Sequence, residues 1–392
     1  MATEFDVVIA GGGVMGSSCA YFLHSSGDFR GSIAVVEPDP SYREAASTRS
    51  ASSIRQQFST PLNIALSVFG LDFLRAAPRL LQHAGTAPDL NFVESTYLYL
   101  ATSEGRRALE ERVSVQQLSG VPVRLHDREA LAARYPWLHT ADLAAGSDTA
   151  AGEGWFDGHT LLAALRAANL QAGVRYLRDR VLGLELSGGR VAAARLQAAG
   201  RISCRYAVNS AGTRARELAM SVGVDLPVFP RKRHVFVFTC PVAVAPCPLV
   251  IDPSGLWFRP ERDRFLCGPP AEPDPDVAAD DFEVDVALFE SQAWPLLAHR
   301  VPAFEAVRLQ SAWVGHYDYN AFDQNAFVGP VPAIPNFLLA SGFSGHGLQQ
   351  APGVGRGLAE YIRFGRYRTL DLTPLSFARF LANAPLREFN VI

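Results

Sequence analysis

The stretch FDVVIAGGGVMGSSCAYFL, residues 5–23, decides the fold of this chain. Residues 5–10 form a short apolar run, which is typical of a strand buried on both faces of a parallel sheet. Gly11, Gly13 and Gly16 follow at GxGxxG spacing, and the pattern then becomes helical. In such a turn the glycines let the backbone approach a pyrophosphate, and the N-terminus of the helix offers free N–H groups to it. The stretch therefore predicts a dinucleotide-binding βαβ unit.

An acidic residue at the end of the next strand supports this interpretation. Residues 32–36 predict a second strand, and Glu37 follows it directly. A carboxylate about twenty residues beyond the glycines is placed to accept hydrogen bonds from the hydroxyls of an adenosine ribose. FAD and NAD share this fingerprint, but no second GxGxxG appears, which disfavours an enzyme with two dinucleotide sites. The segment AASTRS, residues 45–50, suits either a loop that wraps a diphosphate or a solvated loop.

Composition and charge exclude several classes of protein. With 392 residues, of which 48% are hydrophobic, the chain is long enough for about two domains. A net charge of -3 argues against a nucleic-acid-binding surface, and no apolar run reaches the ~18 residues of a membrane span. The five cysteines contain no CxxC pair, so we expect neither a metal site nor a disulfide framework. No signal or transit segment precedes the first strand, and we expect a cytoplasmic location.

The rest of the pattern predicts alternating helices, strands and loops. Helical spacing covers residues 59–82, 159–172 and 294–301, and Pro352 marks the start of a last helix that includes residues 354–362. Strands are predicted at residues 97–100, 174–186, 190–196 and 231–238. The acidic, proline-rich stretch 271–285 predicts a solvated loop.

Four motifs together resemble a known family. They are GGGVMG with Glu37, SIRQQF at residues 53–58, VNSAG at 208–212 and GFSGHGLQQAPG at 342–353. In this order they are similar to the superfamily of FAD enzymes that includes D-amino-acid oxidase, sarcosine oxidase and glycine oxidase. The words EGWFD, PRKRHVF and YDYNAFDQN further resemble a mitochondrial branch of the family that assists the assembly of a respiratory complex. The similarity covers nearly the whole chain.

The resemblance implies an α/β fold with two domains. One is a Rossmann-like FAD-binding domain, and the other is a substrate domain built on an antiparallel sheet, as in glycine oxidase and sarcosine oxidase. We expect the FAD-binding domain to be discontinuous and to comprise residues 1–82, 152–218 and 325–392. The substrate domain would then comprise residues 83–151 and 219–324.

The resemblance also implies which residues hold the cofactor. The final glycine-rich segment would return to the first, with its backbone beside the flavin and a helix N-terminus facing N1 and the C2 carbonyl of the ring. We expect the cofactor-binding residues to be Gly11, Gly13, Val14, Met15, Gly16, Glu37, Ser47, Thr48, Gln56, Val181, Ala211, Gly212, Gly342, Ser344, Gly345, His346, Gly347, Leu348 and Gln349. Relatives tether the flavin through a cysteine where this chain has Gly315 and His316, so we expect FAD to be bound non-covalently.

The activity that the resemblance implies is oxidation of a C–N bond in an amino acid or N-alkyl amino acid, with hydride transfer to flavin N5. Arg55 is the candidate for binding the substrate carboxylate; otherwise it pairs with flavin phosphates or a surface acid. Tyr317 would close the pocket or pack in the core. His346 would be a hydrogen-bonding or structural residue beside the flavin, or else a proton shuttle. Arg259, on a strand-like stretch, would line the substrate side.

Two departures from the family bear on the reaction. Gln349 replaces a lysine that helps hold the substrate carboxylate, and Trp257 or Phe258 replaces a lysine that activates oxygen. These changes argue against sarcosine as the substrate. They leave both oxygen and a quinone or other electron carrier open as the electron acceptor.

A second function stays open, because one branch of the family assists assembly. On this alternative the chain is a flavoprotein that binds a respiratory-complex subunit and has little turnover. A polar pocket with Arg55 facing it favours the enzyme, whereas a filled pocket beside a large exposed apolar patch favours the binding protein.

Overall fold

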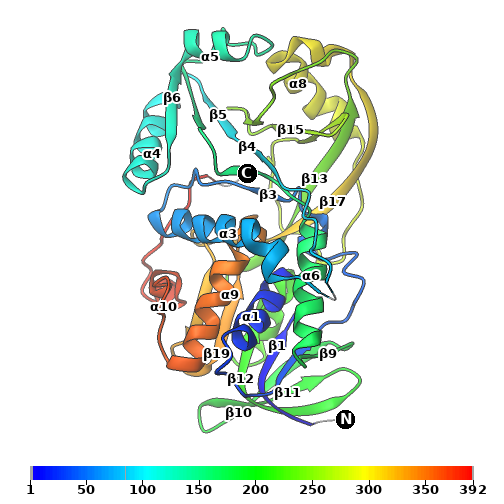
Figure 1. Cartoon of the computed structure of the whole chain (residues 1–392), viewed down its shortest axis with the longest axis vertical. Helices are drawn as coiled ribbons and strands as arrows, with labels where there is room; N and C mark the ends of the chain where they lie inside the picture. Colours follow the sequence, from blue (N-terminus) through cyan, green and yellow to red (C-terminus); the bar gives the residue numbers. More distant parts are fainter. Residues whose placement is uncertain (1–2, 84, 391–392) are drawn as a thin grey trace.

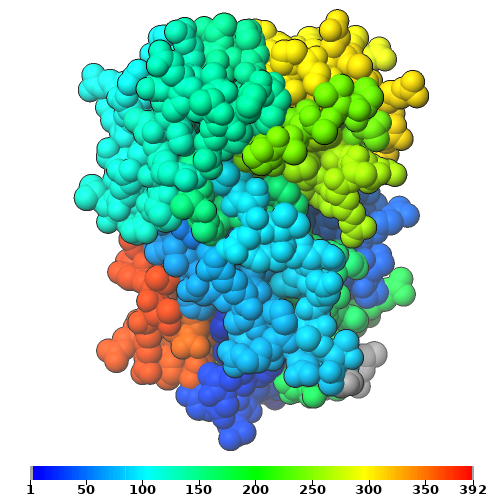
Figure 2. Space-filling model, turned by 45° about the horizontal axis from the view of Figure 1, so that its top comes forward, coloured from blue at the N-terminus to red at the C-terminus, as the bar shows by residue number. Residues whose placement is uncertain are grey.

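The structure is a computed structural model that describes residues 3–83 and 85–390. Two large β-sheets occupy opposite halves of the molecule, and helix α3 (Pro61–Leu80) lies across the region between them (Figure 1). In the space-filling view, the segments around residues 140 and 300 adjoin at the top, and the two ends of the chain contribute to the lower half (Figure 2). Among the described residues, no helix is both long and apolar enough to span a bilayer.

The first sheet is built around β1 (Glu4–Ala10). This strand runs parallel to β2 (Ile33–Val36) on one side and to β12 (Gly200–Asn209) on the other. Successive side chains of β1 enter two different hydrophobic clusters, so the strand is buried on both faces, as its apolar run predicts. The parallel strands β9 (Arg175–Leu177) and β19 (Ile334–Ser341) extend the sheet at its two sides.

Further elements complete this half. Strand β18 (Phe327–Val331) pairs antiparallel with β19, and the hairpin of β10 (Val181–Ser187) and β11 (Arg190–Leu196) pairs with the first part of β12. Helix α1 (Val14–Ser25) packs against α6 (Gly158–Gln171) and α9 (Gly347–Phe364). Short helices follow at α2 (Ala46–Arg49), α7 (Ala215–Met220) and α10 (Ala378–Leu381).

The second sheet has eight strands and is antiparallel except for one pair. The order is β17 (Arg308–Asn320), β13 (Val228–Thr239), β16 (Arg264–Gly268), β15 (Trp257–Glu261), β14 (Leu249–Ile251), β5 (Tyr97–Ala101), β7 (Ala145–Thr149) and β6 (Val123–Asp127). The parallel pair is β14 with β5. Three helices lie in the same half of the molecule as this sheet (Figure 1): α4 (Arg106–Leu118), α5 (Arg128–Arg134) and α8 (Trp294–Arg300). The predicted class, a Rossmann-like sheet with a second, mainly antiparallel sheet, is confirmed.

A third, small sheet has three short strands that come from separate parts of the chain. Strand β8 (Glu153–Trp155) pairs with β3 (Ser53–Ile54) on one side and with β4 (Val93–Ser95) on the other. Strand β3 leads directly into Arg55, so this sheet sets the position of that residue.

Three local predictions need correction. Residues 174–186 form two strands, because β9 pairs with β2 whereas β10 pairs with β11. Helix α9 begins at residue 347, five residues before Pro352, and a continuous buried face through Leu348, Ala351 and Val354 holds the helix despite the proline. The stretch 271–285 is not simply solvated, because its aspartates pair with the basic residues of β13.

We propose the domain boundaries 1–82, 152–218 and 325–392 for the FAD-binding domain, with residues 83–151 and 219–324 as the substrate domain. Every strand of the first sheet falls in the former ranges and every strand of the second sheet in the latter.

Candidate functional site

A cavity of about 670 Å³ runs from the start of α1 to the wall formed by β13 and β17. Residues from both halves of the molecule line it, including the loops after β1, β2 and β12, helix α2 and the start of α9. This size and this mixture of apolar and polar walls are typical of a site for a small molecule or a cofactor.

The turn after β1 forms one end of the cavity. Gly11 has a φ of 97°, and a Cβ at this position would lie 2.3 Å from the carbonyl oxygen of Ser210. The backbone N–H of Gly12 donates to Oε2 of Glu37 at 2.8 Å, and that of Val14 donates to Oγ of Ser47 at 3.1 Å. Burial raises the pKa of Glu37, although the N–H groups that it accepts from favour the carboxylate. The turn thus places a carboxylate beside the N-terminus of a helix.

The neighbouring walls offer further polar and small residues. Val181, Ala211 and Gly212 line the cavity, as do Gly13 and Met15. The hydroxyl of Thr48 is buried and has no hydrogen-bond partner among the described residues, but Thr48 does not line the cavity.

The start of α9 forms the middle of the cavity wall. Gly345, Gly347, Leu348 and Gln349 line it, and the first-turn N–H groups of a helix favour negative charge nearby. A Cβ at Gly345 would lie 2.5 Å from Cζ of Tyr317, so this glycine lets the tyrosine ring pack directly on the loop.

Arg55 lies at the far end and is held from several sides. Its side chain is 4% exposed, and its guanidinium lies over the Phe58 ring with 4.5 Å to the centroid. Its backbone N–H donates to Oε1 of Gln349 at 2.9 Å, and Ser67 donates to its carbonyl. One guanidinium nitrogen, Nη2, donates to the carbonyl of Asn390. Arg55 is therefore a fixed cation on the cavity wall.

The last described residues form part of this end of the site. The buried carboxylate of Glu388 accepts from the N–H and hydroxyl of Ser59 at 2.8 and 2.6 Å and from Nδ2 of Asn63 at 2.9 Å. It also accepts from the N–H of Asn390 at 3.0 Å, and the Asn390 amide donates to the Gln57 carbonyl at 2.7 Å. Glu388 thereby anchors the segment that reaches Arg55.

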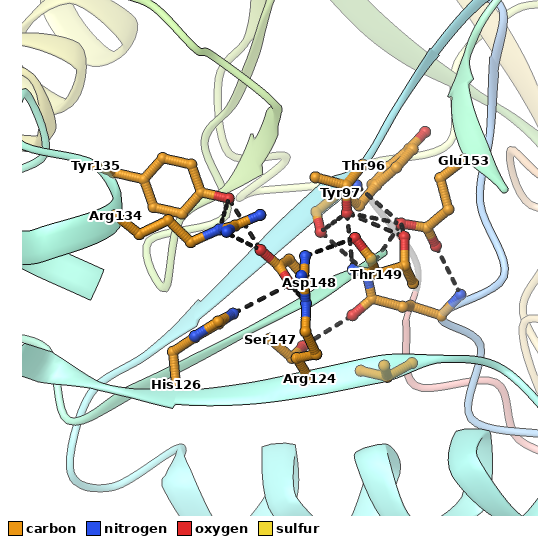
Figure 3. Close-up of polar contacts among 12 residues, drawn as sticks. Thr96, Tyr97, Arg124, His126, Arg134, Tyr135, Ser147, Asp148, Thr149 and Glu153 are labelled. Carbon is orange, nitrogen blue, oxygen red and sulfur yellow. Dashed lines mark hydrogen bonds and ion pairs between the residues drawn. The ribbon is translucent and has the colours of Figure 1, made fainter. Parts of the chain in front are cut away.

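A second buried carboxylate supports Arg55 from behind. Glu153 is fully buried and accepts from the backbone N–H groups of Gln56 at 2.7 Å and Tyr97 at 2.8 Å. It also accepts from Oγ1 of Thr149 at 3.0 Å (Figure 3). Burial raises the pKa of Glu153, and these hydrogen bonds oppose that effect. The residue ties the chain beside Arg55 to β5 and β7.

Asp148 organises the outer side of the same region. Its buried carboxylate lies 2.8 Å from Nε of Arg124, 2.8 Å from Nε of Arg134 and 3.1 Å from Nε2 of His126 (Figure 3). Because the network of Asp148 points to the outer edge of the sheet, it fixes β6 and α5 and does not line the cavity.

The wall formed by β13, β15 and β17 carries aromatic and charged groups. Tyr317 and Trp257 line the cavity, and Arg233 lies over the Tyr317 ring with 4.6 Å to the centroid. Asp274 fixes Arg233 through two hydrogen bonds of 2.7 and 2.9 Å. The loop 271–285 therefore closes over this wall.

Seven of the residues expected in the site do not line the cavity. They are Gly16, Thr48, Gln56, Gly342, Ser344, His346 and Arg259. Gly16 lies under the turn, where a Cβ would be 2.0 Å from the Gly11 carbonyl. Gln56 donates to the Gly152 carbonyl at 3.2 Å, and Arg259 donates to the Ala51 carbonyl at 2.8 Å and to Glu261 at 2.6 Å. Arg259 thus holds a cavity loop from outside the cavity.

Thr48 lies in α2, and the other three lie in the loop before α9. The N–H of Gly342 donates to Asp318 at 2.7 Å, and Oγ of Ser344 accepts from the N–H of Asn320 at 3.0 Å. His346 is buried against the Phe58 ring, with 5.1 Å between ring centroids. Burial and the nearby Arg55 lower the pKa of His346 to about 3, so the imidazole is neutral at physiological pH. That protonation state favours the structural interpretation of His346 over a proton shuttle.

Glu388, Asn390, Glu153 and Asp318 are the residues that sequence reasoning missed. Nothing local marks Glu388 or Asn390, because their partners lie more than 300 residues away in sequence. A signal existed for Arg233, since the basic run at residues 231–233 and the acidic run at 274–276 are complementary in charge.

Comparison with known proteins decides the family. The family model described as "FAD dependent oxidoreductase" (DAO) matches residues 6–361, which is most of the chain. This chain belongs to the DAO family of FAD-dependent oxidoreductases. A DAO-family relative from Xenopus laevis, "FAD-dependent oxidoreductase domain-containing protein 1", is 39% identical over 99% of this chain and 85% of its own length.

Solved structures of the DAO fold superpose closely. L-proline dehydrogenase from P. horikoshii has a TM-score of 0.85 at 20% identity, covering 98% of this chain and 100% of its own. Glycine oxidase from Geobacillus kaustophilus has a TM-score of 0.82 at 23% identity, covering 96% and 99%. The cofactor of this DAO-family chain is FAD. The carboxylate of Glu37 and the α1 N-terminus fit that group.

Proposed function

We propose that the protein oxidises the C–N bond of an amino acid or N-alkyl amino acid, and that Arg55 binds the substrate carboxylate. The observation that carries this proposal is a buried, fixed guanidinium on the wall of the cavity. A guanidinium matches a carboxylate with two parallel hydrogen bonds, which orients the substrate as well as attracting it. The names of the structural neighbours, a proline dehydrogenase and a glycine oxidase, support an amino-acid substrate.

The chain's own residues would prepare the substrate for this reaction. FAD supplies the hydride acceptor when it is bound. Arg55 has one nitrogen committed to the Asn390 carbonyl, and its other nitrogens would take the carboxylate. Gln349 and Ser67 hold the main chain at Arg55 and so fix the depth of the guanidinium. Tyr317 and Trp257 would border the bound side chain and exclude water.

The cofactor would be held chiefly by backbone at the opposite end. We propose that Gly11, Gly13, Val14 and Met15 face the diphosphate and that Glu37 accepts from the ribose. Ser47, with Val181, Ala211 and Gly212, would line the rest of the nucleotide site. The α9 N-terminus would stabilise negative charge on the reduced ring, because Gly347, Leu348 and Gln349 of its first turn line the cavity.

The test is anaerobic spectroscopy of the purified yellow protein. We expect at least one amino acid or N-methyl amino acid from a broad panel to bleach the flavin absorbance in a concentration-dependent way. The corresponding amines that lack a carboxylate should fail, because they have no group for Arg55 to bind. Oxygen and a quinone analogue, added separately to the reduced protein, then identify the electron acceptor.

The alternative is a flavoprotein that binds a respiratory-complex subunit with little turnover. The buried, fixed guanidinium of Arg55 on the cavity wall supports the enzyme instead, because a flavoprotein that only binds a partner has no need of a cation that orients a substrate. Absence of bleaching by every compound in the panel, with FAD fully bound, would overturn the enzymatic proposal and favour the alternative.

A further inference from the structure

A cluster of three possible metal ligands lies far from the cavity, where α8 ends. His299 is the penultimate residue of α8, and His139 and Asp142 belong to the loop between α5 and β7. The potential ligand atoms of the three residues all lie within 4.8 Å of one another. The two segments meet at the top of the molecule, where the chain near residue 140 adjoins the chain near residue 300 (Figure 2). We infer that His139, Asp142 and His299 bind a divalent transition metal, with Zn²⁺ as the best match.

The spacing of the ligand atoms suits this metal. Nε2 of His299 lies 3.4 Å from Oδ2 of Asp142. Two ligands at about 2.0 to 2.2 Å from a tetrahedral zinc ion are separated by nearly this distance. Two imidazoles and one carboxylate also favour zinc, which binds nitrogen donors, over calcium or magnesium, which bind mainly oxygen donors.

The groups around the ligands are arranged as in metal sites. Nδ1 of His139 lies 3.1 Å from the His299 carbonyl, and a donated hydrogen bond there leaves Nε2 of His139 as the free ligand atom. Asp142 is fixed by two hydrogen bonds of 2.9 Å from Arg300. These contacts position the ligands before a metal arrives.

The charge of the cluster also favours a cation. Arg300 is almost fully buried and donates hydrogen bonds to two carboxylates. Its Nε donates to Asp252, and its two Nη atoms donate to Asp142. Two carboxylates and one guanidinium leave a net negative charge beside the two imidazoles.

Three protein ligands leave a fourth position of a tetrahedral zinc ion open. The nearby surface, which includes Trp137 and Pro302, is hollowed beside His139. A water molecule would therefore complete the coordination, and the metal would join the α5–β7 loop to α8. The site is independent of the redox reaction proposed above, because none of its ligands lines the main cavity.

The experiment is calorimetric titration of the flavin-loaded protein with ZnCl₂ after metal has been removed with a chelator and the chelator dialysed away. We expect one tight site and a higher melting temperature in the presence of zinc. His139→Ala and His299→Ala should each weaken binding by roughly tenfold or more and abolish the thermal shift. Both variants should keep the melting temperature of the metal-free protein, since neither imidazole packs in the core.

The matched control is His159→Ala, which removes an exposed histidine at the start of α6. It should bind zinc as the unaltered protein does. Stoichiometric binding that survives both His139→Ala and His299→Ala would place the metal elsewhere and overturn the inference. So would the absence of saturable binding by the unaltered protein.

Discussion

The two ends of the cavity are built in different ways. At the Gly11 end, the essential groups are backbone N–H groups and one carboxylate, Glu37, and these lie close together in sequence, although Val181, Ala211 and Gly212 also line the wall. At the Arg55 end, the essential group is one side chain, and partners from distant segments fix it, including Gln349 and Asn390. The first end is a local motif, whereas the second exists only after the chain has folded.

This difference has a consequence for substitutions. Changes at the Gly11 end should act through sterics and should affect cofactor retention. Changes at the Arg55 end should act through charge and hydrogen bonding, and should affect substrate use while FAD stays bound. The predictions below test that division, beginning with the largest effect.

Gly16→Ala should be the most damaging change. A Cβ at residue 16 would lie 2.0 Å from the Gly11 carbonyl and 2.7 Å from Oγ of Ser210, and backbone cannot move away without disrupting the turn. We expect loss of FAD and of most soluble protein, measured as flavin absorbance per mole of chain. Gly13→Ala is the matched control, because its nearest protein atom would be 3.4 Å away. That variant should fold and bind FAD more weakly; equal FAD content in both variants would contradict the steric account.

Glu388→Ala should lower stability and substrate affinity together. It leaves the buried donors of Ser59 and Asn63 without an acceptor, at a loss of roughly 3 kcal/mol in the free energy of unfolding. Because Asn390 loses its anchor, Arg55 should be less well fixed and the apparent Kd for substrate should rise. FAD should remain bound. Phe389→Ala, at a side chain 66% exposed, is the control and should change neither quantity.

Asp318→Asn should alter the pH dependence of stability. Burial raises the pKa of Asp318 to about 6, so ionising it in the folded protein is unfavourable. Protonated Asp318 makes its full contribution to the free energy of unfolding below the usual pKa of the carboxyl. This contribution is lost as the pH rises through about 6. Asparagine does not ionise and still accepts from the Gly342 N–H. The difference in melting temperature, variant minus unaltered protein, should therefore increase as the pH rises from about 4 to 7. A constant difference would show that Asp318 does not titrate there.

The smallest expected effect concerns the attachment of the flavin. Gly315 offers no side chain for a covalent bond, and His316 is occupied, since its Nε2 lies 2.8 Å from the Asp281 carbonyl. Acid precipitation should therefore release all of the yellow colour into the supernatant. A yellow pellet that becomes colourless in His316→Ala would identify a covalent link at that residue.

The predictability of the structure follows the same division. The βαβ unit was predictable because a buried strand, a glycine turn and Glu37 are adjacent in sequence and each has a local physical cause. The break between β9 and β10 was not, because it depends on which strand each half pairs with. Pro352 was misread as the start of a helix, because the buried face of α9 outweighs one missing N–H.

The site was predictable to a similar degree. Residue type and motif order pointed to Arg55, but its fixation by Gln349, Ser67 and Asn390 had no sequence signal. Arg259 was expected on the substrate side because relatives line that side with the corresponding strand-like stretch. The structure instead turns it toward the Ala51 carbonyl, because the direction of a side chain depends on the register of β15 within the sheet.

The most direct test of the division is stopped-flow reduction of the flavin in Arg55→Ala with whichever amino acid reduces the unaltered protein. A buried carboxylate that loses its charged partner is destabilised by about 3 to 5 kcal/mol, so the rate at limiting substrate should fall roughly a hundredfold or more. Arg55→Lys should recover only part of the loss, because an ammonium does not form two parallel bonds to a carboxylate. The flavin spectrum should persist in both variants. Loss of FAD in Arg55→Ala, or an unchanged rate of reduction, would contradict the assignment of Arg55 to the substrate.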